Sequence, residues 1–181
     1  IVGQCIGANA LAAVGSAYTL MVFLISILLG LSMGSGTVFS LQYGAGDLSA
    51  LRRSIYVSFL LIGTVTILLN VAVFLWLDPI LRWLQVPYDI YSLMRNYLWI
   101  IFWGIVFTFL YNFYAALLRA VGDSVTPLWF LAVSVVLNIG LDLFLILVLD
   151  QGIEGAAVAT VIAQGTAASG ILLYTYKIRP E

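Results

Sequence analysis

Residues 127–149 read PLWFLAVSVVLNIGLDLFLILVL, a stretch whose only polar side chains are Ser134, Asn138 and Asp142. A transmembrane helix needs about 20 consecutive, predominantly apolar residues to cross a hydrocarbon core of about 30 Å. This stretch meets that length, so it predicts a membrane-spanning helix. Asp142 lies well inside it, which raises the question of what stabilises a carboxylate there.

The composition of the whole chain is that of an integral membrane protein. Of its 181 residues, 64% are hydrophobic and 8% are charged. The mean hydropathy is +1.14, far above the range of soluble domains. The formal net charge is −1 and there is no long basic run, so no nucleic-acid partner is expected.

The scarcity of metal-binding and redox side chains narrows the chemistry further. The chain has one cysteine, Cys5, and no histidine, which leaves no internal disulfide, no zinc site and no imidazole proton relay. No cofactor is therefore expected. A proton carried inside the membrane would have to be held by a carboxylate.

Polar breaks divide the chain into five apolar segments, each near or above the length of a membrane-spanning helix. The break at 119–127 offers Ser124 or Thr126 as a helix N-cap. The break at 77–89 contains an amphipathic stretch that suggests a short helix lying in the membrane interface (Ile80, Leu81, Trp83 and Leu84). The predicted fold class is all-α, a polytopic transmembrane helix bundle with spans at residues 17–42, 54–77, 92–118, 127–149 and 155–176.

Basic residues are unevenly divided between the two sets of turns. By the positive-inside rule, the richer side is cytoplasmic, which places the N-terminal stretch outside and the C-terminus in the cytoplasm. A start at Ile1 outside the membrane, with no charged flank, further predicts a preceding helix and a piece cut from a longer polypeptide. Aromatic residues near the segment ends, including Tyr97, fit interfacial belts. The richer side carries Arg52, Arg53, Arg119, Lys177 and Arg179, and the other side carries Arg82 and Arg95.

Asp142 is the residue that most needs a functional explanation. A charged carboxylate near the centre of a membrane-spanning helix costs ~2.5–3.5 kcal/mol on insertion scales, so Asp142 should face the bundle interior or a water-filled cavity. Asn138, one helical turn earlier, shares its face. Carboxylate and amide oxygens suit Na⁺ or a proton-carrying site. The alternative is a neutral, hydrogen-bonded Asp142 that holds helices together.

Other polar and small residues within the spans have weaker signals. Asn112, Thr160 and Gln164, each taken alone, are more typical of helix packing, because such side chains bond neighbouring helices or their own backbone. Gly30 and Gly34 form a Gly-x-x-x-Gly pattern, which is typical of close helix packing.

One enzyme class, the intramembrane aspartyl proteases, needs to be tested against the sequence. The strings GAGD (44–47) and YD (88–89) match short motifs of that class. Two carboxylates must share a water molecule to cleave a peptide bond. Both strings fall in turns on opposite sides of the bilayer, so no enzyme is expected.

Five stretches spread over essentially the whole chain share their order and spacing with a known family. They are IGANALAAVG (6–15), GLSMGSGTVFSLQYGAGD (30–47), AALLRAVGDSVTPL (115–128), LNIGLDLF (137–144) and GIEGAAVATVIAQ (152–164). Together they resemble the multidrug and toxic compound extrusion (MATE) family of the multidrug/oligosaccharidyl-lipid/polysaccharide exporter superfamily. The resemblance implies that residues 1–181 are a partial N-terminal lobe, helices two to six, of a twelve-helix, two-lobe transporter.

The resemblance also implies roles for four residues. Asp142 matches the family's fifth-helix acid and Asn138 the asparagine one turn before it. Asn112 matches a fourth-helix asparagine and Thr160 a sixth-helix threonine of the same polar cluster. These four would bind the coupling ion, Na⁺ or H⁺. The expected partners are the lipid bilayer, small organic substrates, and the first helix and second lobe of the same polypeptide; the first helix carries a further acid in many members.

The expected function is secondary active antiport, coupled to H⁺ or Na⁺, that exports drugs or other organic, often cationic, compounds across a bacterial or archaeal plasma membrane. Two alternatives stay open. One is a lipid-linked oligosaccharide flippase of the same superfamily, which would need a strongly cationic lumen. The other is a non-transporting membrane packing subunit. Candidates for lining a cavity for flat hydrophobic cations are Met33, Phe109, Tyr111, Phe113 and Tyr114.

Overall fold

Every regular element in the computed structural model, which describes residues 8–83 and 85–178, is a helix. This confirms the predicted all-α class. Residues 1–7 and Arg179, which entered the predicted orientation, lie outside the described residues. The helices are α2 (Ala8–Gly44), α3 (Leu48–Trp83), α4 (Tyr88–Trp103), α5 (Ile105–Ala120), α6 (Val125–Leu143), the π-helix η1 (Phe144–Val148) and α7 (Gly152–Ile178).

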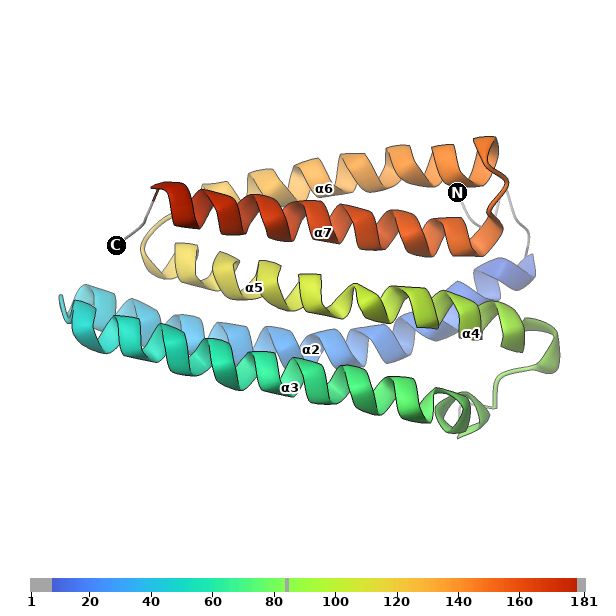
Figure 1. The fold of residues 1–181 in the computed structure, drawn as a ribbon, viewed down its shortest axis with the longest axis horizontal. Coiled ribbons are helices and arrows are strands. Elements are labelled where there is room, and N and C mark those ends of the chain that lie inside the picture. The colour runs from blue at the N-terminus through green and yellow to red at the C-terminus, as the bar shows by residue number, and fades with distance from the viewer. Residues whose placement is uncertain (1–7, 84, 179–181) are drawn as a thin grey trace.

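The helices lie side by side in an elongated bundle (Figure 1). Helices α2 and α3 form one side, α6 and α7 form the other, and α4 and α5 run end to end between them. The α2–α3 turn, the α5–α6 turn and the C-terminal end of α7 lie at one end of the bundle. The α3–α4 and α6–α7 connections lie at the opposite end. The bundle therefore has the two sets of turns that the five-span prediction requires.

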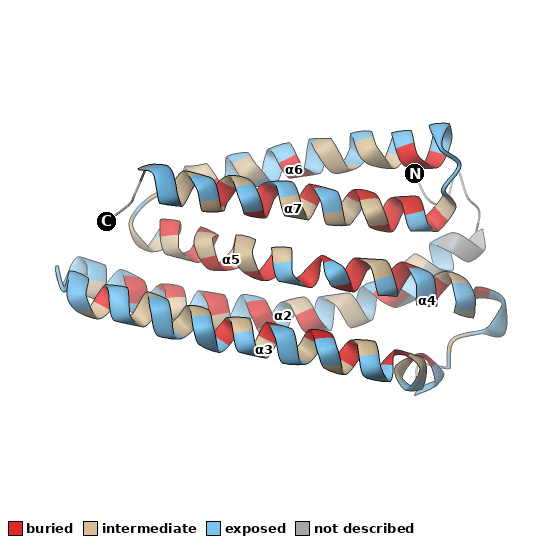
Figure 2. Ribbon diagram, in the orientation of Figure 1, coloured by how far each residue is buried: buried red, intermediate tan, exposed pale blue. Residues whose placement is uncertain are grey.

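The outer surface of the bundle is strongly apolar. Buried residues line the faces that the helices turn toward one another, whereas the outward faces are exposed (Figure 2). These outward faces carry large apolar side chains such as Leu75 and Val136, each 72% exposed. Four described helices are long and apolar enough to cross a membrane, and a fifth span results if α4 and α5 count as one. The surface is that of a bundle immersed in lipid.

Two of the predicted spans have internal irregularities that the sequence did not reveal. The predicted span 92–118 is not one helix, because α4 and α5 meet at Gly104 with a bend of 41°. The predicted span 127–149 begins as α6 and ends as the π-helix η1. Both irregularities lie inside the membrane-spanning segments, where each broken backbone hydrogen bond has to be replaced locally.

The segment predicted as a separate interfacial helix is, over residues 80–83, a continuation of α3, and Leu84 lies outside the described residues. The backbone leaves helical geometry at Trp76 (φ −112°, ψ 18°), and Pro79 follows within the helix. Proline lacks an N–H and its ring crowds the carbonyl one turn earlier, which explains the kink. After the kink, Leu81 is fully buried and Trp83 is 93% exposed, so this segment is amphipathic as expected but not separate.

Aromatic side chains fill the centre of the bundle. Phe113 packs edge-on against Phe39 and Phe59, with ring centroids 5.9 and 5.3 Å apart, and Phe109 lies beside it at 6.0 Å. Phe109 and Phe113 therefore pack in the core, and the expectation that they line a substrate cavity is wrong. Tyr97 is also buried, at 7% exposure, so its predicted place in an interfacial belt is wrong.

The close helix approach predicted at Gly30 and Gly34 occurs elsewhere. A Cβ placed on either glycine would meet no described atom within 4 Å. A Cβ on Gly36 would instead lie 3.3 Å from the Ala116 Cβ of α5. Within the described chain, α2 therefore approaches α5 through Gly36, because that glycine is the one that faces the neighbouring helix.

The turn between α5 and α6 is held by Asp123. Its carboxylate accepts hydrogen bonds from the Thr126 amide at 3.0 Å and the Thr126 hydroxyl at 2.7 Å, and the Tyr174 hydroxyl of α7 donates to it at 3.3 Å. The predicted cap Ser124 makes no side-chain capping bond. The Thr126 amide first, then its hydroxyl and Tyr174, hold the pKa of Asp123 below its ordinary value.

We predict that Asp123→Ala lowers the free energy of unfolding by about 1 kcal/mol, because the first turn of α6 loses its cap. A lowered folded-state pKa means that this contribution is present above the ordinary aspartate pKa of 3.8 and is lost as the pH falls through the folded value. Thermal unfolding of the full-length polypeptide in detergent, wild type against Asp123→Ala, measures the difference. Ser124→Ala is the control and should be silent; an equal loss in both variants would contradict the assignment.

Candidate ion-binding site

A row of polar side chains on α6 faces α7, and we call it the polar seam: Ser134, Asn138 and Asp142. The three residues are spaced four apart, which places them one above the other on one face of the helix. Ser134 was not singled out from the sequence, although its i, i+4, i+8 relation to Asn138 and Asp142 was a usable signal. The seam lies within an otherwise apolar interface between α6 and α7.

The first two positions of the polar seam are satisfied by α7. The Ser134 hydroxyl donates to the Ala163 carbonyl at 2.9 Å. The Asn138 amide Nδ2 donates to the Thr160 hydroxyl at 3.3 Å, and Thr160 donates in turn to the Ala156 carbonyl at 2.9 Å. The structure thus brings Asn138 and Thr160 into direct contact across the helix pair.

The third position, Asp142, differs from the other two. Its Oδ1 atom is buried and has no hydrogen-bond partner among the described residues. Among the described residues, one ion pair forms, between Arg95 and Asp78 at 2.9 Å. Asp142 is therefore not paired with a described cation. A buried acceptor without a partner carries an uncompensated desolvation cost, so this oxygen is available to a ligand.

The backbone next to Asp142 is also irregular. The π-helix η1 begins two residues later, at Phe144, and the Leu149 amide donates to the Phe144 carbonyl at 3.2 Å. A π-turn widens the helix and is frequent at functional sites. On the facing helix, a Cβ on Gly155 would lie 3.2 Å from the Leu145 Cβ, so the absence of a side chain there admits the widened turn.

The oxygen atoms around Asp142 suit a small hard cation. The carboxylate is one donor, the Asn138 side-chain oxygen is another because its Nδ2 is directed to Thr160, and the Thr160 hydroxyl keeps a lone pair. Oxygen donors of this kind bind Na⁺, and the carboxylate alone binds a proton. In the part of the chain that the structure describes, no group of three or more Cys, His, Asp or Glu residues is arranged as a transition-metal site.

Asn112 lies on a different wall of the bundle. Its Nδ2 donates to the Thr108 carbonyl of its own helix at 2.8 Å, and among the described residues no hydrogen bond joins it to the polar seam. It faces a groove of about 520 Å³ between α2 and α5, which we call the α2–α5 groove. The groove is lined by Leu29, Met33, Gly36, Thr37, Ser40, Asn112, Ala116, Arg119 and Ala120.

Known proteins share both the sequence and the fold of this chain. The MatE family model matches residues 1–144. A probable multidrug resistance protein of Bacillus subtilis, YpnP, is 38% identical over 176 residues, which are 97% of this chain and 40% of that protein. The multidrug export protein MepA of Staphylococcus aureus is 32% identical over 170 residues, which are 90% of this chain and 37% of that protein.

A solved structure gives the same architecture. It is described as the outward-facing conformation of a multidrug resistance MATE family transporter of the MOP superfamily. It superposes with a TM-score of 0.92 at 23% identity, covering 98% of this chain and 39% of that one. The chain spans about 40% of the length of the curated relatives it matches. Because the family model covers most of the chain and the helical bundle agrees with it, this membrane-spanning chain belongs to the MatE family.

Proposed function

We propose that the full-length polypeptide is a cation-coupled antiporter that exports organic, often cationic, compounds, and that Asp142 takes up the coupling ion. The observation that carries the proposal is the buried Asp142 oxygen, which has no partner among the described residues and lies one helical turn from Asn138, whose amide bonds the Thr160 hydroxyl. The family membership and the names of the relatives, multidrug resistance and multidrug export proteins, support the class of activity.

The mechanism follows from the cost of the charge. An ionised Asp142 is stable only where water or a cation reaches it, so the charged form favours a conformation in which the site is open. Binding of H⁺ or Na⁺ neutralises the carboxylate and favours a conformation in which the site is closed. A penalty of ~2.5–3.5 kcal/mol corresponds to a shift of about 70- to 400-fold in that equilibrium. Because the ion binds the two conformations with different affinities, an ion gradient drives the cycle between them.

The α2–α5 groove is our candidate for the surface that the exported compound contacts. Met33, 64% exposed, offers a flexible apolar contact, and Asn112 offers an amide at the groove wall. Arg119 lies at the end of the groove near the α5–α6 turn and disfavours a cation there, which places a cationic group toward Asn112 and away from Arg119.

The proposal also includes the orientation of this bundle in the membrane. The described basic residues of the richer set, Arg52, Arg53, Arg119 and Lys177, lie toward the end of the bundle that holds the α2–α3 and α5–α6 turns. The positive-inside rule makes this end cytoplasmic. The chain would form helices two to six of an N-terminal lobe, whose first helix and second lobe complete the transporter.

The described residues support neither of the two alternatives. A flippase for lipid-linked sugars would need cationic side chains inside the bundle, and the described Arg and Lys side chains are all exposed. A packing subunit, in which Asp142 only joins helices, would require a hydrogen-bond partner for its buried oxygen. No described residue supplies one.

We predict that Asp142→Asn abolishes ion-driven efflux. Everted vesicles that contain the full-length polypeptide should extrude a fluorescent cationic dye when a proton gradient or a Na⁺ gradient is imposed, and the gradient that acts names the ion. Efflux by the variant should be at least about 10-fold slower than by the wild type, because ion binding no longer neutralises a charge at position 142. Asp89→Asn, the same substitution at an exposed position of α4, is the matched control and should keep wild-type efflux. Equal efflux from wild type and Asp142→Asn, at equal expression, would refute the role of Asp142.

We also predict that Asp142→Leu raises the free energy of unfolding by about 1–3 kcal/mol, because an apolar side chain of similar size removes the unpaired buried oxygen. Thermal unfolding of the purified full-length polypeptide in detergent measures the change. A packing role predicts the opposite sign, since helix-joining hydrogen bonds would be lost. A decrease in stability would therefore favour the packing subunit.

A further inference from the structure

The break between α4 and α5 is the main interruption of a membrane-spanning segment in the described chain. At the break, the Gly104 amide donates to the Ile101 carbonyl at 2.8 Å, an i→i−3 bond in place of the helical i→i−4 pattern. The two helix axes differ by 41°. Such a break inside lipid persists only when neighbouring groups satisfy the backbone around it.

Asn70 of α3 supplies one such group. It is 9% exposed, and its Nδ2 donates to the Phe102 carbonyl at 2.7 Å, two residues before Gly104. Burial of an amide in an apolar bundle is costly unless it is hydrogen-bonded. Thr66, one turn earlier on α3, is more deeply buried, at 1% exposure, but bonds the Ile62 carbonyl of its own helix. Asn70 is therefore directed to the break, whereas Thr66 is not.

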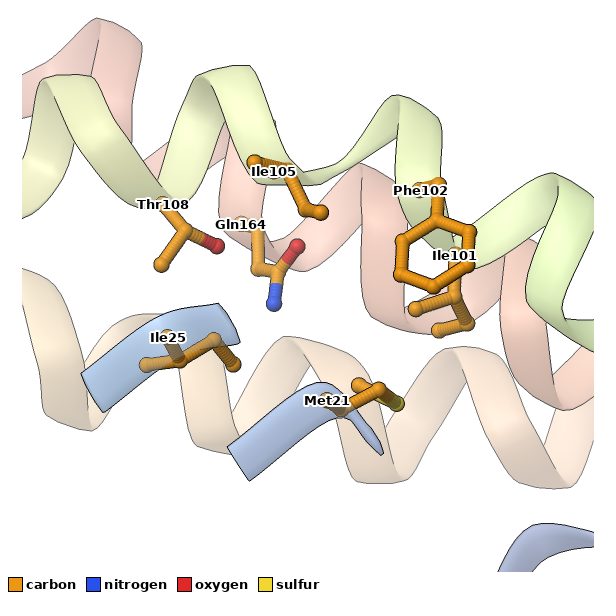
Figure 3. Close-up of a pocket in the computed structure, with 7 residues that line it drawn as sticks. All are labelled: Met21, Ile25, Ile101, Phe102, Ile105, Thr108 and Gln164. Atoms are coloured by element: carbon orange, nitrogen blue, oxygen red, sulfur yellow. The ribbon is translucent and has the colours of Figure 1, made fainter. Parts of the chain in front are cut away.

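Gln164 of α7 approaches the same break from the other side. A Cβ placed on Gly104 would overlap the Gln164 Oε1 atom and would lie 3.0 Å from the Ile101 carbonyl oxygen. Figure 3 shows the Gln164 amide between Ile105 and Met21, with its oxygen toward the break and its nitrogen toward α2. The cavity beside it has a volume of about 10 Å³, the space of one water molecule. The present arrangement thus requires glycine at position 104.

The break lies between the polar seam and the α2–α5 groove. Gln164, which approaches the break, is one helical turn after Thr160, and Thr160 accepts a hydrogen bond from Asn138 of the polar seam. Asn112, about two turns after Gly104 on α5, lines the α2–α5 groove. A change in the relation of α4 to α5 therefore links the ion-binding site to the groove.

We infer that Asn70 and Gln164 are positioning residues of a joint at Gly104, and that the hydrogen bonding of this joint responds to the charge on Asp142. The role of the joint in export rests on the proposed function. Neutralisation of Asp142 changes the contact of α6 with α7, Gln164 of α7 carries this change to the break, and α4 then shifts relative to α5.

Hydrogen–deuterium exchange tests the inference at a single fixed pH. The full-length polypeptide in lipid nanodiscs is compared with its variants at the amides of residues 104–108. Asn70→Ala should speed their exchange by roughly 2- to 12-fold, the effect of one lost hydrogen bond, and Thr66→Val should not. Asp142→Asn, which mimics the neutralised carboxylate, should change the same rates by at least about 2-fold, and the control Asp89→Asn should not.

A second pair of variants tests the joint by efflux. Gly104→Ala should slow export, because the added Cβ meets the Gln164 oxygen, and Gln164→Ala should slow it as well, because the joint loses a positioning residue. Gly63→Ala, whose Cβ would make only an ordinary contact of 3.6 Å with Phe109, is the control. An unchanged thermal unfolding temperature in Gln164→Ala separates a positioning role from a merely structural defect.

Two results would overturn the inference: exchange at 104–108 that is the same in wild type and Asp142→Asn, or wild-type efflux in Gln164→Ala. Failure of the proposed function is separate, because it appears as wild-type vesicles that show no ion-driven efflux, whatever the exchange rates. If efflux is ion-driven and the exchange does not respond to Asp142, the proposed function stands and the joint does not.

Discussion

A carboxylate inside an apolar helix bundle is the constraint around which this molecule is organised. Its charge is costly unless a cation, a proton or water compensates it. Ser134 and Asn138 on the same face of α6 are satisfied by α7, whereas no described residue bonds the buried oxygen of Asp142. The polar seam therefore ends in an unsatisfied acceptor next to a widened π-turn, a combination that costs stability and that function explains more readily than packing.

The departures from regular helical geometry have a common physical explanation. In lipid the backbone cannot turn to water, so every irregularity needs a local replacement for its hydrogen bonds. The kink at Trp76 follows from Pro79, and the Asn70 side chain satisfies a carbonyl at the Gly104 break. The π-helix after Asp142 is accommodated by Gly155 on the facing helix. Two of these three places adjoin the proposed ion-binding site and its connection to the groove.

The sequence predicted the features that depend on composition and on spacing within one helix. Hydropathy alone located the membrane-spanning segments, and the i, i+4 relation of Asn138 and Asp142 placed them on one face. Gly104 was missed because an isolated glycine is common in transmembrane helices, and Asn70, which bonds the nearby Phe102 carbonyl, is far away along the chain. The direction of Asn112 was missed for the same reason: the packing of α5 against α2 decides it. Asp123 was overlooked as a cap because Ser124 and Thr126 beside it are equally acceptable by residue type.

The most direct test of the account is the number of cations bound per polypeptide. Binding of radioactive Na⁺ and proton uptake are measured on the purified full-length polypeptide, wild type against Asp142→Asn, under the same conditions. The account predicts that the wild type binds one more cation, Na⁺ or H⁺, than the variant. Equal cation binding by the two proteins would contradict the claim that the unpaired Asp142 carboxylate is the site of ion coupling.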